Sequence, residues 1–521
     1  MELKLLTASM REATLVLEDG GRYDARSPYQ LLLNGKLQGT VSRCVFTLRR
    51  LLPDTPYRVQ LQADGQTVAE CEFCTQAEFV TLNVRDFGAH GDGETNDTAF
   101  LQAAILCCPP KGRVLVPRGV YRVTHLFLKS HLTLELARGA VLLGIPQREQ
   151  IPVLPGMTIS WDEESEYNIA AWEGNPLASF CSLITGVDVE DVTLCGEGIV
   201  DGGASAENWW NAPKQKRGAW RPRSLYLCRC QNIRVTGLTF RNSPAWNLHP
   251  YFSQRLLFAD LRVEGPASSP NTDGFDPESC DDVRLYGGWF SVGDDCVAIK
   301  SGKLYMGRKY HTPCQHIEIA HCRMGDGHGG VTIGSEMSGG VTDLRVRDCE
   351  FEHTDRGLRI KTRRGRGQNG VIDNVLFERI RMRDVKAPLT ANAFYYCDPD
   401  GHDTDVQRRE AAPVDETTPR VGTLRFRQLE CTGCQAAAGY FLGLPEMPIA
   451  CVELTDVSVA FTPDALPFAP IMADGVSPCA GRGIYAENVE ELRLCRVRIT
   501  GQTGDELETR QVARVIRNDE E

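Results

Sequence analysis

Four short clusters of acidic, basic and glycine residues are the parts of this sequence whose residue types could do chemistry. They are Asn271-Thr272-Asp273-Gly274-Phe275-Asp276, Gly293-Asp294-Asp295-Cys296, Gly327-His328-Gly329-Gly330 and Arg359-Ile360-Lys361. Each cluster alone is typical of a turn or an exposed strand face. Together they offer carboxyl groups, among them Asp273, Asp294 and Asp295, an imidazole and two cations. Cleavage of a glycosidic bond needs a protonated acid and a carboxylate that activates water or attacks carbon. The set therefore predicts a glycoside-cleaving site, provided that the fold brings the clusters together.

A sequence repeat predicts that the fold does so. In the unit that begins at Ile317, apolar residues stand at offsets 0, +2, +5 and +7. The same spacing recurs from Ile233, Leu256, Val283, Leu344, Val375, Leu424, Val452 and Leu492, with one glycine substitution. Offsets 0 and +2 indicate the inward side chains of one short strand, and +5 and +7 those of the next strand after a bend. One unit cannot cover its own apolar face, so the units must stack. The repeat predicts an all-β fold, a right-handed parallel β-helix.

The repeat also predicts which side chains meet. Asp294 stands 11 residues after Val283, and His328 stands 11 residues after Ile317. Equal offsets in adjacent coils place both side chains in one column, about 5 Å apart. Three neighbouring aspartates should raise the pKa of one of them by mutual repulsion. We expect the glycines around His328 to leave room for a sugar ring.

The first residues follow another pattern. Short alternating runs in residues 1–78 predict a small antiparallel β-sandwich, and Leu52–Val59 resembles a corner of fibronectin type III domains. Residues 79–521 then form the β-helix domain. Thr98–Ile105 is predicted to be a short amphipathic helix that covers the first coil, with Asn96 or Asp97 near its N-cap.

Composition excludes several function classes. The chain has 521 residues and a net charge of −12, which argues against a general binder of nucleic acids or anionic membranes. Its start does not look like a signal peptide, and no apolar run is long enough for a transmembrane helix. We therefore expect a cytoplasmic protein whose twenty cysteines are reduced and mostly buried. The oligomeric state is left open.

The four clusters, in this order, resemble glycoside hydrolase family 28, the polygalacturonases. The resemblance covers most of residues 80–500. It includes Asn83–Ala89 and the stretch Asn242-Ser243-Pro244-Ala245-Trp246. Asp276–Cys280 and Gly334–Gly340 are similar to bacterial exo-acting members, some of which carry a fibronectin-like N-terminal domain.

The resemblance implies roles for particular residues. Asp294 would be the general acid, and Asp273 and Asp295 would activate water in an inverting reaction. Such a mechanism predicts that acid and base lie about 6.5–9.5 Å apart. His328 would tune the acid. The residues expected to bind substrate are Arg359, Lys361, Asn271, Lys300 and Tyr395, with Tyr396 as the alternative tyrosine. No metal or other cofactor is expected.

The implied substrate is a pectic oligosaccharide of α-1,4-linked galacturonic acid. The segment between Asp295 and His328 is long and carries Lys303, Arg308 and Lys309, so we expect it to close one end of the groove and favour exo-cleavage. Three alternatives remain open: a rhamnogalacturonan-directed hydrolase, a calcium-dependent pectate lyase and a non-catalytic carbohydrate-binding β-helix.

Overall fold

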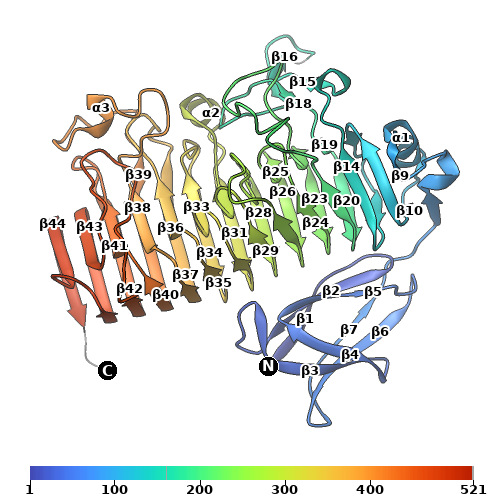
Figure 1. Ribbon diagram of the computed structural model, residues 1–521, viewed down its shortest axis with the longest axis horizontal. Helices are drawn as coiled ribbons and strands as arrows, with labels where there is room; N and C mark the ends of the chain where they lie inside the picture. Colours follow the sequence, from blue (N-terminus) through green and yellow to red (C-terminus); the bar gives the residue numbers. More distant parts are fainter. Residues whose placement is uncertain (160, 519–521) are drawn as a thin grey trace.

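The protein is an elongated solenoid with a smaller β-domain against one side (Figure 1). The computed structural model describes residues 1–159 and 161–518. The predicted fold class is confirmed: the chain is nearly all β, with a right-handed parallel β-helix after an N-terminal antiparallel part. None of the helices in the described residues has the length and apolar character needed to span a bilayer.

The N-terminal part contains two antiparallel sheets. One has the order β1 (Glu2–Ala8), β2 (Glu12–Glu18), β5 (Val45–Arg49), and the other β4 (Lys36–Arg43), β3 (Asp24–Leu33), β6 (Pro56–Ala63), β7 (Gln66–Cys74). Leu15, Leu17, Val59 and Leu61 are fully buried in a core of their own between these sheets. The boundary at residue 78 and the fibronectin type III assignment stay predictions.

Parallel strands stack into three ladders along the solenoid. The first ladder contains β8 (Val80–Asn83), β10 (Gly112–Val116), β13 (Thr133–Leu136), β20 (Glu190–Gly196), β23 (Gln231–Thr236), β26 (Gln254–Ala259), β28 (Asp281–Tyr286), β31 (Cys314–Ala320), β34 (Val341–Arg347), β37 (Val371–Arg383), β40 (Thr423–Cys434), β42 (Ile449–Phe461), β43 (Arg482–Thr500) and β44 (Leu507–Asn518). The second contains β9 (Asp92–Asn96), β11 (Gly119–Val123), β14 (Ala140–Gly144), β21 (Ile199–Asp201), β24 (Thr239–Arg241), β27 (Arg262–Glu264), β29 (Trp289–Ser291), β32 (Arg323–Met324) and β35 (Glu350–Glu352), and it continues into β37.

The third ladder carries the candidate site. It contains β12 (Leu126–Phe127), β19 (Ile184–Val187), β22 (Leu225–Cys228), β25 (Leu248–Tyr251), β30 (Val297–Ile299), β33 (Val331–Gly334), β36 (Arg356–Lys361), β38 (Ala387–Asn392) and β41 (Ala437–Leu442). Phe275 forms the bridge between β25 and β30. Excursions from the coils hold β15 (Val153–Leu154), β16 (Met157–Ile159), β17 (Glu166–Asn168), β18 (Ser179–Phe180), α2 (Leu304–Tyr310) and α3 (Thr404–Gln407). Strand β39 (Arg420–Val421) instead pairs with β37 in the first ladder.

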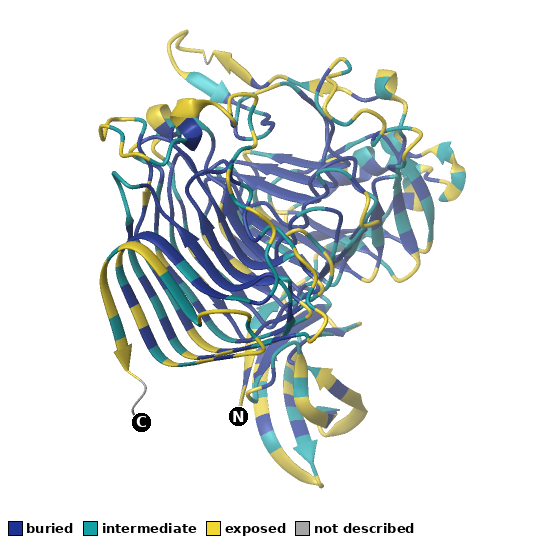
Figure 2. Cartoon of the chain, turned by 60° about the vertical axis from the view of Figure 1, so that its left-hand side comes forward, coloured by how far each residue is buried: buried dark blue, intermediate teal, exposed yellow. Residues whose placement is uncertain are grey.

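All nine predicted repeat starts lie side by side in the first ladder. Ile233 pairs with Leu256, Leu256 with Val283, Val283 with Ile317 and Ile317 with Leu344, and the pairing continues without a gap to Leu492. These side chains are at most 2% exposed and belong to one continuous core. Figure 2 shows this buried interior within a partly exposed outer surface. The repeat is therefore the inner lining of the solenoid.

A left-handed residue makes the bend in every one of these nine coils. It stands four residues after the repeat start, as in Asp260, His321 and Arg379, whose φ angles are 53°, 53° and 54°. Only two of the nine positions are glycine, Gly237 and Gly287. Positive φ is uncommon for other residues, so the stacked coils must compensate its cost. This bend has little signal in the sequence because many residue types occupy it.

The predicted cap is present at the first coil. Helix α1 (Thr98–Cys107) buries Leu101 and Ile105 against the solenoid core. The Asn96 side chain accepts a hydrogen bond from the Thr98 backbone N–H at 3.1 Å, whereas the Asp97 carboxylate accepts bonds from the preceding loop. All twenty cysteines are free and thirteen are buried, which agrees with their predicted role as small apolar residues.

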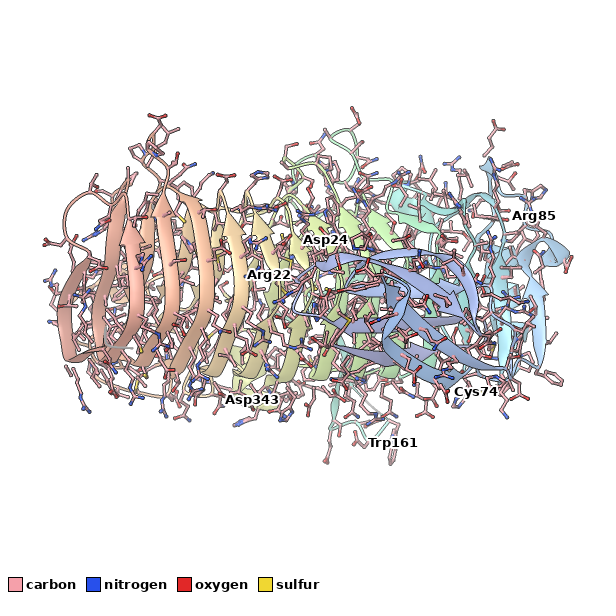
Figure 3. All side chains as sticks on the ribbon, turned by 90° about the horizontal axis from the view of Figure 1, so that it is seen from below. Arg22, Asp24, Cys74, Arg85, Trp161 and Asp343 are labelled. Carbon is pink, nitrogen blue, oxygen red and sulfur yellow. The ribbon has the colours of Figure 1, made fainter. Side chains whose placement is uncertain are left out.

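The N-terminal domain packs on the outer face of the first ladder, as the view from below shows (Figure 3). Val16 and Val45 contact Leu257, Ala259 and Tyr286 in a small apolar cluster. Hydrogen bonds and ion pairs surround this cluster, for example between Glu18 and Arg347 and between Asp260 and both Arg43 and Arg49.

We expect Phe377→Ala to lower the free energy of unfolding by about 3–5 kcal/mol, because its ring is fully buried in the core. The ring lies between Phe351 and Phe426, with centroids 6.5 and 6.1 Å away. Denaturant titration followed by circular dichroism measures the change. Phe79→Ala is the matched control, because Phe79 is 76% exposed and its loss should change stability by less than about 0.5 kcal/mol. Equal effects of both substitutions would contradict a core built on the stacked repeat.

Candidate active site

Two of the predicted cations project from the outer face of the third ladder. In β36, Leu358 and Ile360 point into the core and are 0% and 1% exposed. Side chains alternate along a strand, so Arg359 and Lys361 point outward. The apolar pattern of one strand thus places both cations on the same face.

The three aspartates reach this face from two neighbouring coils. Asp294 and Asp295 lie in the turn between β29 and β30, and Asp273 stands two residues before the bridging Phe275. One carboxylate oxygen from each aspartate lies within 4.8 Å of the other two. The predicted convergence is therefore present. These nearest carboxylate oxygens lie closer together than the separation of about 6.5–9.5 Å expected for an inverting pair. For these atoms, the predicted separation is wrong.

Asp295 is a buried anion held by two cations. Its side chain is 0% exposed. Arg359 Nη1 donates to one oxygen at 2.9 Å, and Lys361 Nζ donates to the other at 2.8 Å. Burial alone would raise the pKa of Asp295, but Lys361 and Arg359 outweigh it and hold the pKa well below its usual range. Arg359 and Lys361, expected to bind a substrate carboxylate, are thus already paired, and a substrate can meet them only on the side that Asp295 leaves free.

Asp273 has a different environment. Its side chain is 5% exposed, and burial together with repulsion from Asp294 raises its pKa. Lys300 Nζ lies 3.7 Å from Asp273 Oδ2, 3.6 Å from Asp276 Oδ1 and 3.3 Å from Glu336 Oε2. Lys300 was expected to bind substrate, but the structure buries it among these three carboxyl groups. Its direct contact with the site is through Asp273.

Asp294 is the accessible member of the three. Its side chain is 22% exposed, compared with 5% for Asp273 and 0% for Asp295. His328 Nδ1 lies 3.2 Å from Asp294 Oδ1, and the His328 backbone N–H donates to the Asp294 carbonyl at 3.0 Å. The hydrogen bond to Asp294 raises the pKa of His328. Equal offsets in adjacent coils therefore place these two side chains together, as the repeat predicts.

The glycines around His328 leave space for neighbouring side chains of the protein. A Cβ on Gly329 would lie 2.7 Å from Asp295 Oδ1 and 2.4 Å from Thr332 Oγ1. A Cβ on Gly330 would lie 2.7 Å from the Phe351 ring. The expectation that these glycines leave room for a sugar ring is therefore corrected: Gly329 leaves space for the buried carboxylate.

The other two predicted binding residues lie on different sides of the cluster. The Tyr395 ring centroid is 5.8 Å from the Arg359 guanidinium carbon and 5.5 Å from Lys361 Nζ. Tyr396 instead stacks on His402, so Tyr395 is the tyrosine beside the site. Asn271 Oδ1 accepts a hydrogen bond from Arg221 Nη2 at 2.7 Å, so Asn271 contacts the protein through this atom.

Sequence reasoning missed an aromatic stack beside the site. The rings of Trp172 and Trp220 are stacked with centroids 4.8 Å apart, and Trp246 is stacked on Trp172 at 6.4 Å. Lys300 Nζ lies 4.4 Å from the Trp246 ring, which links the stack to Asp273. Trp172 and Trp220 come from excursions outside the repeat, so no register predicts their place. Trp246 lies in the family-like stretch and was the available signal.

A buried acid–base pair beneath Lys300 was also missed. His249 Nε2 and Glu278 Oε2 are 2.9 Å apart, and both side chains are 0% exposed. Burial raises the pKa of Glu278 to about 7 and lowers the pKa of His249 well below its usual value. Asp276 is also buried, and burial followed by repulsion from Asp273 raises its pKa. The available signal was the family-like stretch Asp276–Cys280, which carries two acids, Asp276 and Glu278.

Three groups in the described residues have the spacing of a metal site, and one of them is the aspartate cluster. There, Arg359, Lys361 and Lys300 already supply positive charge, so the carboxylates do not depend on a metal ion for charge balance. The other two groups are Glu18, His321 and Asp348, and His131, Glu190 and Asp191. Neither of these lies among the site residues.

The long segment after Asp295 forms helix α2 and joins separate excursions. The three basic residues that the sequence singled out all have acidic partners: Lys309 pairs with Glu166 at 2.5 Å, Arg308 with Glu416 at 2.6 Å and Lys303 with Asp398 at 2.8 Å. The Lys303 backbone N–H also donates to the Gly174 carbonyl at 2.9 Å. The segment therefore ties loops together beside Lys300 and Glu336, and its cations are not free.

Comparison with known proteins agrees with this geometry. The family model for "Glycosyl hydrolases family 28" matches residues 136–435, and one described as "Rhamnogalacturonase A/epimerase, pectate lyase-like" matches residues 81–150. A probable polygalacturonase of Vitis vinifera is 30% identical over 428 residues, which are 79% of this chain and 82% of that protein.

Solved structures show the same fold. The family 28 exopolygalacturonase of Yersinia enterocolitica aligns with a TM-score of 0.70 and 20% identity over 98% of both chains. A hyperthermoactive exopolygalacturonase from Thermotoga maritima aligns with a TM-score of 0.57 and 24% identity, over 84% of this chain and 91% of the other. The family match covers more than half of the chain and contains all four clusters. The protein is therefore a glycoside hydrolase and belongs to family 28, the polygalacturonase family.

Proposed function

We propose that the enzyme removes α-1,4-linked galacturonic acid from the end of pectic oligosaccharides, with inversion at the anomeric carbon. The observation that carries this proposal is the contrast among three neighbouring aspartates. Asp295 is buried and ionised by two cations, Asp273 is buried beside Lys300, and Asp294 is accessible beside His328. Hydrolysis of a glycoside requires carboxyl groups with such different environments.

Asp294 fits the role of general acid, because it is the aspartate that a substrate can reach most easily. In this role it gives its proton to the leaving glycosidic oxygen. His328 Nδ1 lies 3.2 Å from the same carboxyl group. A protonated His328 would stabilise the Asp294 carboxylate that forms as the bond breaks.

Asp273 and Asp295 fit the role of positioning and activating water. Both oxygens of Asp295 accept hydrogen bonds from cations, so this carboxylate is a poor candidate for covalent attack on carbon. A water molecule beside it could still be oriented by Asp295 and deprotonated by Asp273. The short spacing of the carboxylates by itself would suit a retaining enzyme, and product stereochemistry separates the two mechanisms.

Recognition of a uronic acid fits Arg359, Lys361 and Tyr395. The Arg359 and Lys361 side chains retain 7% and 10% exposure. Charge-assisted hydrogen bonds from these cations to a sugar carboxylate would be strong in such a buried place. A methyl ester would lose this charge interaction, so the free acid should be preferred.

The excursions that α2 joins beside the aspartates support attack at a chain end. The segments that carry Gly174, Lys303 and Glu336 meet next to Lys300. Lys300 itself contacts Asp273. A wall so close to the aspartates leaves little length of groove on that side. A rhamnogalacturonan-directed hydrolase remains the second candidate, because the family description that matches residues 81–150 names a rhamnogalacturonase.

We expect Asp294→Asn to lower kcat on oligogalacturonides by about 10²–10⁴-fold, because the amide cannot donate the catalytic proton. Initial rates of reducing-sugar release measure the loss, and circular dichroism verifies the fold. Asp64→Asn is the control with the same chemical change, since Asp64 is exposed in the N-terminal domain. If folded Asp294→Asn retains wild-type kcat, Asp294 is not the acid.

Inversion predicts that the first product from an α-linked substrate is the β-anomer, because water attacks from the face opposite the leaving group. Proton NMR during the first minutes of hydrolysis of a trigalacturonide measures the anomer before mutarotation. Free galacturonic acid at the same pH provides the equilibrium reference. An α-anomer at the earliest time would show retention and would assign a covalent role to Asp273 or Asp295.

Exo-cleavage predicts that monomer or dimer appears from the start on polygalacturonate, while viscosity falls slowly. Chromatography of timed samples, with viscometry in parallel, measures both quantities. Rhamnogalacturonan and a highly methyl-esterified pectin serve as matched substrates, and both should be cleaved more slowly. A rapid fall in viscosity with mid-length oligomers would contradict the closed groove. Faster cleavage of rhamnogalacturonan would favour the second candidate, and an unsaturated product would indicate a lyase.

A further inference from the structure

A groove runs along the seam between the N-terminal domain and the first coils of the solenoid. It consists of two cavities of about 380 and 220 Å³ that share Arg49 and Glu197 in their walls. The larger cavity has the size of a small-molecule site. The floor comes from β10, β13, β20 and the turns that follow them, and the other wall comes from β2 and β5. The N-terminal domain lies on the side of the solenoid opposite α2 and α3 (Figure 1), so the groove is separate from the excursions at the active site.

The walls of this seam groove are strongly basic. The two cavities are lined by eight arginines and four carboxylate residues, in a chain whose net charge is −12. One of the four acids is Glu12, and burial raises its pKa to about 7. Concentration of positive charge on one surface of an acidic protein attracts anions. The groove thus has a charge opposite to that of the chain as a whole.

Three of the arginines are available to a ligand. Arg50, Arg118 and Arg138 are exposed, and within the described chain no carboxylate forms an ion pair with any of them. Val116 pairs with Leu136 in successive coils, so Arg118 and Arg138 hold equivalent positions two residues further on. Coils stack at about 4.8 Å. The two arginines therefore stand one coil step apart along the solenoid axis.

Aromatic side chains lie at the other end of the groove. Tyr23 from the N-terminal domain and Trp289 from β29 both line the smaller cavity. Arg262 lies over the Trp289 ring, with its guanidinium carbon 3.6 Å from the centroid. Aromatic rings provide apolar contact surface together with polar edges, and the C–H faces of sugar rings pack on such surfaces. Cations at one end of the groove and aromatic rings at the other suit a ligand that is both a sugar and an anion.

We propose that the seam groove is a second, non-catalytic binding site for an acidic oligosaccharide with a carboxylate on each sugar. The choice of this ligand rests on the proposed function, because the substrate of that function is such a chain. Binding at the seam would hold a polymer on the enzyme between cleavage events and raise the effective concentration of its ends. The N-terminal domain would then contribute one wall of a substrate-retention site.

The test is retention of the full-length protein by polygalacturonate in native affinity gels. The experiment uses the Asp294→Asn background, so that the polymer is not digested. We expect the double substitution Arg118→Glu/Arg138→Glu to raise the apparent dissociation constant by about fivefold or more, because two attractive contacts become repulsive. Arg420→Glu/Arg498→Glu is the matched control, since it makes the same charge change at exposed arginines outside the groove. This control should bind like its parent.

A second measurement separates the groove from the active site. With Asp294 restored, the Arg118→Glu/Arg138→Glu protein should hydrolyse a trigalacturonide at a rate within about twofold of wild type, because the active site is intact. Its rate on dilute polygalacturonate should fall. If the wild-type protein does not hydrolyse a trigalacturonide, the proposed function is contradicted. Binding of polygalacturonate at the seam groove is not.

Several results would contradict the proposal that the seam groove binds an acidic oligosaccharide. One is equal retention of the Arg118→Glu/Arg138→Glu and Arg420→Glu/Arg498→Glu proteins by polygalacturonate. Another is competition by single-stranded DNA at the same charge concentration as polygalacturonate, which would show binding of any polyanion. Unchanged retention in a gel that contains neutral dextran in place of polygalacturonate would show that the carboxylates are not recognised.

Discussion

The stacking of coils in register is the constraint on which the rest of the structure depends. Each coil buries only a few apolar side chains, and these are covered only when the next coil places its own in line. Ile233, Leu256, Val283 and their successors therefore form one ladder with exposures of at most 2%. The same register fixes the outward residues, so Asp294 meets His328 across one coil step. The positions of such an outer site are therefore set by the core beneath it.

Charge compensation is the second constraint, and it is local to the active site. Three carboxylates whose oxygens lie within 4.8 Å would repel one another strongly if all were ionised. The protein pairs Asp295 with Arg359 and Lys361, buries Asp273 beside Lys300, and leaves Asp294 accessible beside His328. Desolvation of these groups is offset by the pairing. The environments of the three side chains consequently differ although their chemistry is the same.

Irregular segments decide what the repeat leaves open. Helix α2 and the excursions near Gly174, Glu166 and Asp398 are joined by ion pairs and backbone contacts. The N-terminal domain likewise covers part of the first ladder and creates a basic seam. Both features depend on contacts between residues more than 90 positions apart. Such contacts follow no period, so the sequence offered only the composition of the segments and not their partners.

The sequence by itself determined the solenoid, the cap predicted at Thr98–Ile105 and the convergence of the four clusters, because a repeat of apolar residues specifies both the inner lining and the outer register. Only the tertiary structure decided which partner each charged side chain has. Lys300 and Lys303 proved to be paired with carboxylates of the protein, Arg359 and Lys361 were already bound to Asp295, and Gly329 proved to leave space for that carboxylate. Periodicity fixes the direction in which a side chain points, whereas its partner and its pKa depend on which distant loop lies against it.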